Sequence, residues 1–145
     1  MSSPRHRDAA IFRSKAALLQ VKRAFRNAFE ENLDRWPIAD SLSHQRILAE
    51  SRTPLWTAEK DSEVRFVAGK IHNLRLAIQR LNGVEVPPYR VLSFWKQIGR
   101  ASRLKGYARG RELREGCLIP SVGGGLCQLS NALYETAVKA GLDYG

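Results

Sequence analysis

The residue best suited to chemistry in this sequence is Cys127, which follows three consecutive glycines at the start of a predicted helix. A cysteine in the first turn of a helix lies near unpaired backbone N–H groups and the positive end of the helix dipole, and both favour the reactive thiolate. Three glycines cost backbone entropy, so a fold keeps them where the backbone needs unusual dihedral angles or a close approach. The run Gly-Gly-Gly-Leu-Cys-Gln at 123–128 is therefore the candidate site.

The residue types around Cys127 suggest a role for each position. Cys127 is the candidate nucleophile of a hydrolase or transferase, and Gln128 can supply a side-chain donor to an oxyanion. The glycine loop would bring a substrate carbonyl close to backbone donors. The candidate ligand-binding residues belong to this loop and to the polar stripe that Cys127 begins on the helix: Gly123, Gly124, Gly125, Ser130, Asn131 and Tyr134.

Two other interpretations of the same run remain open. Free cysteines are among the most buried residues, so Cys127 could be a small core residue and the glycines a tight packing turn. Alternatively, the chain is a non-catalytic binding or accessory module whose loop N–H groups hold a ligand. No histidine follows Cys127, although nucleophilic thiols usually need a base within hydrogen-bond reach. The residues alone do not decide between enzyme and module.

The sequence predicts neither a metal site nor a cofactor. Cys117 and Cys127 are the two cysteines, too few for a disulfide framework or a structural zinc site. The histidines His6, His44 and His72 are far apart, at no spacing typical of metal ligands.

Hydrophobic periodicity predicts helices over 8–35, near 43–51, over 61–81 and over 126–140. The clearest is the third, whose apolar residues recur at steps of three and four: Val64, Val67, Ile71, Leu74, Ile78 and Leu81. His72 lies away from this seam, so we expect it to be exposed. In the last helix, Leu126 should face the core, with the Cys127 stripe about 120° away.

Short apolar runs predict strands at 91–94 and 117–119, the second ended by Pro120. Between them lies a basic stretch, punctuated by Gly106, Gly110 and Gly116, that reads as loop. The predicted class is α+β: N-terminal helices, then short strands, then a C-terminal helix carrying the Gly-Gly-Gly-Leu-Cys-Gln motif at its start.

The net charge of +10 is concentrated at the N-terminus, because residues 1–26 hold seven Lys or Arg and one Asp. We expect the 8–35 helix to cover the core with a solvated basic face. A weaker alternative is that it binds an anionic membrane surface or nucleic acid, but no nucleic-acid-binding motif accompanies it. Neither a signal peptide nor a membrane span is visible, so the expected location is the cytoplasm.

Several segments together resemble the VanW family, named for an accessory protein of B-type vancomycin-resistance clusters. The resemblance covers about residues 53–145, which we take as a VanW-like domain preceded by a basic helical region at 1–52. It rests on the segments Lys70–Ile78, Val86–Pro88, Val91–Trp95, Ile98–Gly99, Gly106–Tyr107, Gly116–Pro120 and Val122–Tyr134. The Gly-Gly-Gly-Leu-Cys-Gln run is the most specific of them.

The resemblance implies a role in glycopeptide resistance or cell-envelope biology, with a cell-wall peptide or glycopeptide-related ligand. Family members typically continue past the cysteine helix into a strand and a Glu-Arg-x-x-His-Ser segment. Since this sequence ends at Gly145, we expect an incomplete domain that lacks a histidine partner for Cys127 and is inactive as an enzyme in this form. We also expect it to self-associate through unprotected strand edges.

Overall fold

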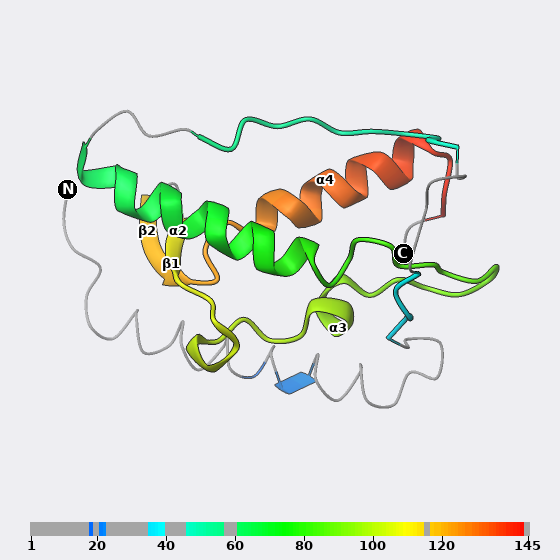
Figure 1. The fold of residues 1–145 in the computed structure, drawn as a ribbon, viewed down its shortest axis with the longest axis horizontal. Helices are drawn as coiled ribbons and strands as arrows, with labels where there is room; N and C mark the ends of the chain where they lie inside the picture. The colour runs from blue at the N-terminus through cyan, green and yellow to red at the C-terminus, as the bar shows by residue number, and fades with distance from the viewer. Residues whose placement is uncertain are drawn as a thin grey trace.

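The computed structural model describes residues 18, 21–22, 35–39, 46–56, 61–114 and 117–143. Within these ranges helices precede and follow one two-stranded sheet, which confirms the α+β class (Figure 1). In chain order the elements are α2 (Asp61–Ile78), α3 (Phe94–Ile98), the 3-10 helix η1 (Arg103–Lys105), β1 (Arg109–Arg114), β2 (Cys117–Val122) and α4 (Leu126–Lys139).

Helix α2 confirms the clearest periodic prediction, but the face that it buries differs from the predicted seam. Val67 and Leu74 are buried as expected, whereas Val64 and Ile78 are exposed. The buried face also includes small and polar residues that no apolar pattern could reveal: Gly69, Lys70, Asn73 and Ala77. The apolar periodicity therefore predicted the position of the helix correctly, but only some of the residues that it buries.

The sheet is a single antiparallel pair in which Arg109 pairs with Val122 and Arg114 with Cys117. Strand β1 corrects the prediction of a loop across this basic stretch. Charged residues hide its apolar pattern, and Gly110 is kept in the strand because neighbouring backbone approaches it closely. Strand β2 also continues through Pro120 to Val122 instead of ending at the proline, since a proline is tolerated where its position needs no ladder donor.

The predicted strand at 91–94 is wrong, because a short helix begins at Phe94. Ser93 caps it by accepting a hydrogen bond from the Lys96 backbone N–H at 3.4 Å, and Gly99 ends it. Ile98, at the end of this helix, is completely buried. This segment therefore contributes to the core through the short helix, and not through an alternating strand.

The hydrophobic core lies where α2, α3 and α4 meet. Its buried members are Ala77, Ile98, Tyr107 and Leu126. Partly buried residues around them include Phe94, Trp95, Val122 and Leu129. Leu126 thus faces the core as predicted, and α4 ends with Ala140 as its C-cap and Gly141 at a positive φ of 70°, as the glycine stop predicted.

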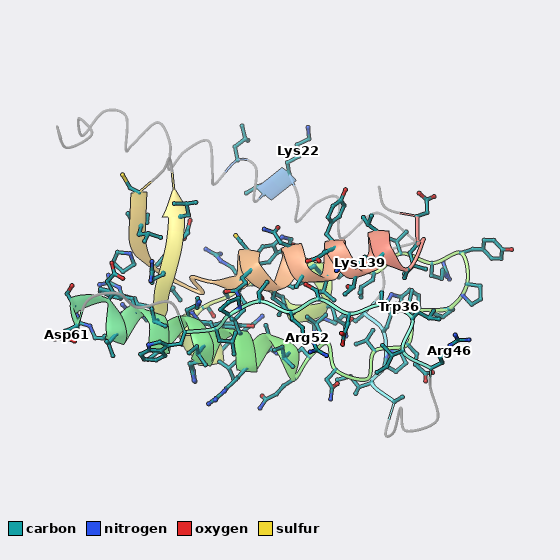
Figure 2. All side chains as sticks on the ribbon, turned by 90° about the horizontal axis from the view of Figure 1, so that it is seen from above. Lys22, Trp36, Arg46, Arg52, Asp61 and Lys139 are labelled. Carbon is teal, nitrogen blue, oxygen red and sulfur yellow. The ribbon has the colours of Figure 1, made fainter. Side chains whose placement is uncertain are left out.

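Residues 46–56 form an extended segment that runs antiparallel along α4 (Figures 1 and 2). Its polar groups meet successive turns of the helix: the Lys139 Nζ donates to the Glu50 carbonyl at 3.3 Å, and the Ser51 hydroxyl to Glu135 at 2.7 Å. The predicted helix near 43–51 is wrong for residues 46–51, because this segment is extended and contacts α4 through side-chain hydrogen bonds.

Most of the predicted 8–35 helix lies outside the described residues. Leu18, Val21 and Lys22 are helical, and Arg35 is not. Within the described ranges no helix has the length and apolar character needed to cross a bilayer.

Candidate functional site

The glycine loop connects β2 to α4 and packs directly against β1. A Cβ on Gly124 would overlap the carbonyl group of Gly110 and lie 3.0 Å from the carbonyl oxygen of Arg111. Gly123 and Gly125 adopt positive φ angles of 78° and 99°, which side chains rarely allow. The glycines are therefore required by close backbone packing and by backbone conformation, the role that the packing-turn interpretation gave them.

A buried asparagine on α2 fixes the loop in place. Asn73 is 0% exposed, and its Nδ2 donates to the carbonyl oxygens of Ala108 and Gly124, both at 3.0 Å. Its Oδ1 accepts from the Ala108 backbone N–H at 2.8 Å. One buried side chain thus connects α2, the residue before β1 and the glycine loop through three hydrogen bonds.

Lys70, one turn before Asn73, packs on the other end of the loop. Its side-chain carbons occupy the space that a Cβ on Gly125 would need. Lys70 is only 6% exposed. Burial lowers the pKa of its amine below the usual 10.5, and the positive charge of Arg111 lowers it further. A charged side chain is therefore kept in an unfavourable environment so that its aliphatic part can cover the loop.

Most backbone N–H groups of the candidate site already have partners within the chain. Those of Gly123 and Gly124 donate to the carbonyls of Ala108 and Ser121, each at 3.0 Å. Those of Leu126 and Gln128 donate to loop carbonyls at 3.4 and 3.0 Å. Donors in use inside the fold are not available to a ligand, so the loop N–H groups form few of the contacts that an oxyanion hole or an anion cradle needs.

Cys127 is exposed and is the second residue of α4, so its predicted place in the first helical turn is confirmed. His72, the histidine within the described ranges, is exposed as predicted, and its Nε2 lies 2.8 Å from the Gly106 carbonyl oxygen. On α2 it is about 160° around the helix from Lys70, which faces the glycine loop. The structure therefore does not bring a described histidine to the thiol.

The side-chain amide of Gln128 is also engaged. Its Nε2 donates to the Thr53 hydroxyl at 2.9 Å and to the Pro54 carbonyl at 3.2 Å. This amide consequently fastens the 46–56 segment to the start of α4 and is turned toward that segment.

The polar stripe predicted on α4 is largely open to solvent. Cys127, Asn131 and Tyr134 are exposed, and Ser130 beside them is partly buried. Val138, one turn further on, is exposed as well and adds an apolar group. The hydrogen bonds of the 46–56 segment lie on the neighbouring face of the helix, at Gln128, Glu135 and Lys139.

Sequence reasoning missed Lys70 and Asn73, the residues that hold the site. Both sit among apolar neighbours in α2, where polar residues look like parts of a solvated face. Gly69, an isolated glycine inside a strong helical pattern, was the available signal, because such a glycine usually marks a close contact. A Cβ on Gly69 would indeed overlap the Arg109 carbonyl group. Across the described part of the chain no three His, Cys, Asp or Glu residues gather as metal ligands.

Comparison with known proteins identifies the relatives of this chain. The VanW-like protein family matches residues 69–144, from the middle of α2 through α4. The vancomycin B-type resistance protein VanW of Enterococcus faecalis is 32% identical over 88 residues, which are 61% of this chain and 32% of that protein. The uncharacterized protein YoaR of Bacillus subtilis is 35% identical over 71 residues, 49% of this chain and 23% of YoaR.

The chain thus spans less than a third of the length of these curated relatives. No solved structure matches it. The family match covers more than half of the chain, including Asn73, the glycine loop and Cys127. The chain therefore belongs to the VanW-like protein family.

Proposed function

We propose that this chain serves a cell-envelope role connected with glycopeptide resistance, as an accessory module that binds a cell-wall peptide through the exposed stripe of α4. The observation that carries the proposal is the contrast between two faces of that helix. The 46–56 segment occupies one face, while Cys127, Asn131 and Tyr134 remain exposed on the next. A thiol, an amide and a phenol in a row offer both hydrogen bonds and apolar contact to a peptide.

Two further points support a module in preference to an enzyme. The N–H groups of Gly123, Gly124 and Leu126 and the amide of Gln128 have partners within the chain, so few donors remain to stabilise an oxyanion. The relative with a named role, the enterococcal VanW protein, is called a vancomycin B-type resistance protein, and this links the family to glycopeptide resistance without implying a catalytic step.

The test is a titration of the isotopically labelled chain with soluble peptidoglycan fragments, followed by NMR. Saturable shifts should appear at Cys127, Asn131 and Tyr134. The double variant Asn131→Ala/Tyr134→Ala should bind at least about tenfold more weakly, because it removes the polar and aromatic contacts. Lys139→Gln, on the neighbouring face of the same helix, is the matched control and should bind normally. Equal binding by the double variant and the control would reject the proposal.

A second candidate, a thiol enzyme acting on a cell-wall amide or peptide with Cys127 as nucleophile, is favoured by one observation. The thiol is exposed in the first turn of a 14-residue helix, where a substrate can reach it. Cys117, exposed in β2, provides an internal reference. In the single-thiol variants Cys117→Ser and Cys127→Ser, the alkylation rates with iodoacetamide can be compared at about pH 6.

If Cys127 reacts more than about tenfold faster than Cys117, the enzyme becomes the better hypothesis. Similar rates support the binding module. Cys127→Ser should also leave the melting temperature nearly unchanged, since the side chain is exposed.

A further inference from the structure

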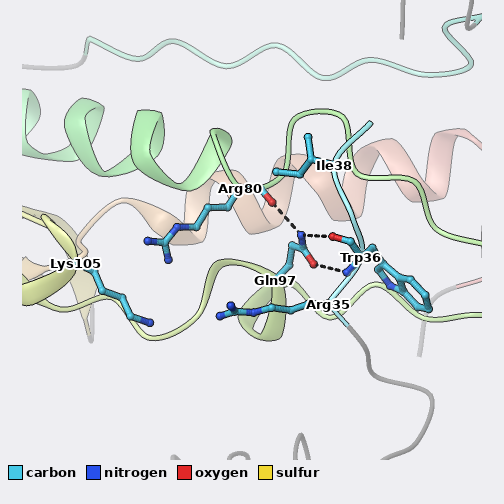
Figure 3. Close-up of a pocket in the computed structure, with 6 residues that line it drawn as sticks. All are labelled: Arg35, Trp36, Ile38, Arg80, Gln97 and Lys105. Atoms are coloured by element: carbon cyan, nitrogen blue, oxygen red, sulfur yellow. Dashed lines mark hydrogen bonds between the residues drawn. The ribbon is translucent and has the colours of Figure 1, made fainter. Parts of the chain in front are cut away.

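A second region, remote from the glycine loop in the chain, gathers positive charge around an open pocket of about 340 Å³. Its cationic side chains come from three separate places: Arg35, Arg80 just after α2, and Lys105 in η1 (Figure 3). This volume is at the lower end of the range for small-molecule sites.

The three positive groups converge at Gly99. A Cβ built on this glycine would lie 2.8 Å from the Lys105 Nζ, 3.1 Å from the Arg35 Nη2 and 3.9 Å from the Arg80 Nη1. Gly99 has a positive φ of 72° and carries no side chain to fill this point. Three cationic head groups therefore gather around this one glycine.

Neutral groups hold the arginines in position. The Arg35 Nε donates to the Lys96 carbonyl at 2.9 Å, and the Arg80 Nη1 donates to the Ile98 carbonyl. Capping the end of α3 in this way explains where the two guanidinium groups sit. It does not explain why Lys105 joins them, and among the described residues no carboxylate forms an ion pair with any of the three.

The pocket wall is built by a buried glutamine. Gln97 is 7% exposed, and its amide exchanges hydrogen bonds with the Trp36 backbone, accepting at 3.0 Å and donating at 3.1 Å. The same amide donates to the Arg80 carbonyl at 3.1 Å. Figure 3 shows these bonds joining the backbone beside Arg35 to that of Arg80. Both arginines are thus attached to a fixed frame before any ligand arrives.

We propose that this pocket is a binding site for a phosphate group. Three converged cations repel one another unless an anion lies between them, and a phosphate accepts several hydrogen bonds from guanidinium and ammonium donors at once. Because the two guanidinium groups are already oriented by carbonyls, binding requires little ordering of the arginine side chains. The phosphate can belong to a soluble small molecule or to a lipid headgroup, and the chemistry of the pocket is the same for both.

The test measures binding of inorganic phosphate and of glycerol phosphate to the full chain by NMR and calorimetry, at constant ionic strength set with chloride. Saturable binding with shifts at Gly99 and Lys105 is expected. Lys105→Gln should weaken binding at least about fivefold, because it removes one of three charges from an already assembled site. Arg103→Gln is the matched control: Arg103 belongs to the same 3-10 helix, is exposed, and does not line the pocket.

A second variant tests the point beside Gly99 where the three cations converge. Gly99→Ala places a methyl group where the cations converge and should abolish phosphate binding. Gly141→Ala is its control, because Gly141 has a similar φ of 70° but nothing within 4 Å of the added Cβ. If Gly99→Ala unfolds while Gly141→Ala does not, Lys105→Gln alone decides the outcome.

A vesicle arm identifies the source of the phosphate. Binding to phosphatidylcholine vesicles with and without phosphatidic acid is compared for the parent chain, Lys105→Gln and Arg103→Gln. Binding to phosphatidic acid that Lys105→Gln weakens and Arg103→Gln does not supports a lipid headgroup, whereas the same pattern with soluble phosphates only supports a small molecule. Equal effects of the two variants, or no binding in either arm, would overturn the proposal.

Discussion

The start of α4 and the rest of its length contact the molecule in different ways. At its start, the glycine loop meets α2 and β1 through buried backbone contacts and the three hydrogen bonds of Asn73. Along its length, the helix meets the 46–56 segment through exposed polar side chains. Buried bonds and close packing contribute much more to stability than exposed polar pairs. The candidate site therefore begins at a rigid point and extends along a loosely covered helix.

The first way to break this comparison is to fill the space between the glycine loop and β1. In Gly124→Ala the new methyl group overlaps the Gly110 carbonyl and approaches that of Arg111. Both carbonyls belong to the backbone of β1, so neither can move aside without distorting the strand. We expect a loss of about 3 kcal/mol in the free energy of unfolding, measured by denaturant titration. Gly141→Ala, which meets no atoms within 4 Å, should lose about 1–2 kcal/mol from its positive φ alone. Equal losses would argue against tight packing at the loop.

The next largest effect should come from Asn73→Ala. It leaves the Ala108 N–H and the Gly124 carbonyl buried without their side-chain partner, at an expected cost of about 2–3 kcal/mol. Arg75→Ala, exposed on the same helix, is the control and should change stability by less than about 0.5 kcal/mol. Comparable melting temperatures for the two variants would mean that Asn73 does not anchor the loop.

The 46–56 segment should respond much less. Gln128→Ala removes two hydrogen bonds that are partly open to solvent, those to Thr53 and Pro54, and should lower the free energy of unfolding by no more than about 1 kcal/mol. NMR relaxation should show the backbone of residues 50–53 becoming more mobile, while amide exchange of the glycine loop stays unchanged. Faster exchange at the loop as well would show that the two regions are coupled more strongly than the contacts indicate.

The smallest expected effect is a pH dependence at Glu135. Hydrogen bonds from Lys139 and then Ser51 lower the pKa of this carboxyl below its usual 4.5. A lowered carboxyl pKa favours the folded contacts above about pH 4.5, and this contribution is lost as the pH falls through the folded-state value. The 46–56 segment should therefore be held less firmly in acid.

Variants at the two donors sharpen this last prediction. Carbon-detected NMR titration should show the Glu135 pKa rising toward its usual value in Lys139→Gln and by a smaller amount in Ser51→Ala. No change in either variant would mean that these exposed contacts do not persist in solution.

The sequence predicted the elements with strong periodicity and failed where packing overrides local pattern. The helices over 61–78 and 126–139 follow from apolar spacing, and the end of the second also follows from its glycine stop. The first ends three residues before the predicted Leu81. The strand at 109–114 could not be found, because Gly110 and the charged residues interrupt its apolar pattern. Its backbone packs closely on α2 and the glycine loop, and no local pattern reveals such contacts. The available signal for the helix at Phe94 was Ser93, whose side chain caps it, with Gly99 as its stop.

The candidate site was predicted in position but not in its supports. The sequence placed Cys127 at a helix start and predicted the stripe that continues through Asn131 and Tyr134. Asn73 and Lys70 lie fifty or more residues before the glycine loop in the chain, and only the fold brings them to it. The basic pocket was invisible for the same reason, since Arg35, Arg80 and Lys105 share no local pattern.

The central claim is that the Gly-Gly-Gly-Leu-Cys-Gln run is a locked support that fixes Cys127 at the exposed start of α4. Amide hydrogen exchange, followed residue by residue in the parent chain and in Asn73→Ala, tests it most directly. The account predicts slow exchange at Gly123, Gly124 and Ala108 in the parent chain, where these N–H groups have partners at 2.8–3.0 Å, and much faster exchange at all three in the variant. Exchange near the rate of an unprotected peptide in the parent chain would contradict it.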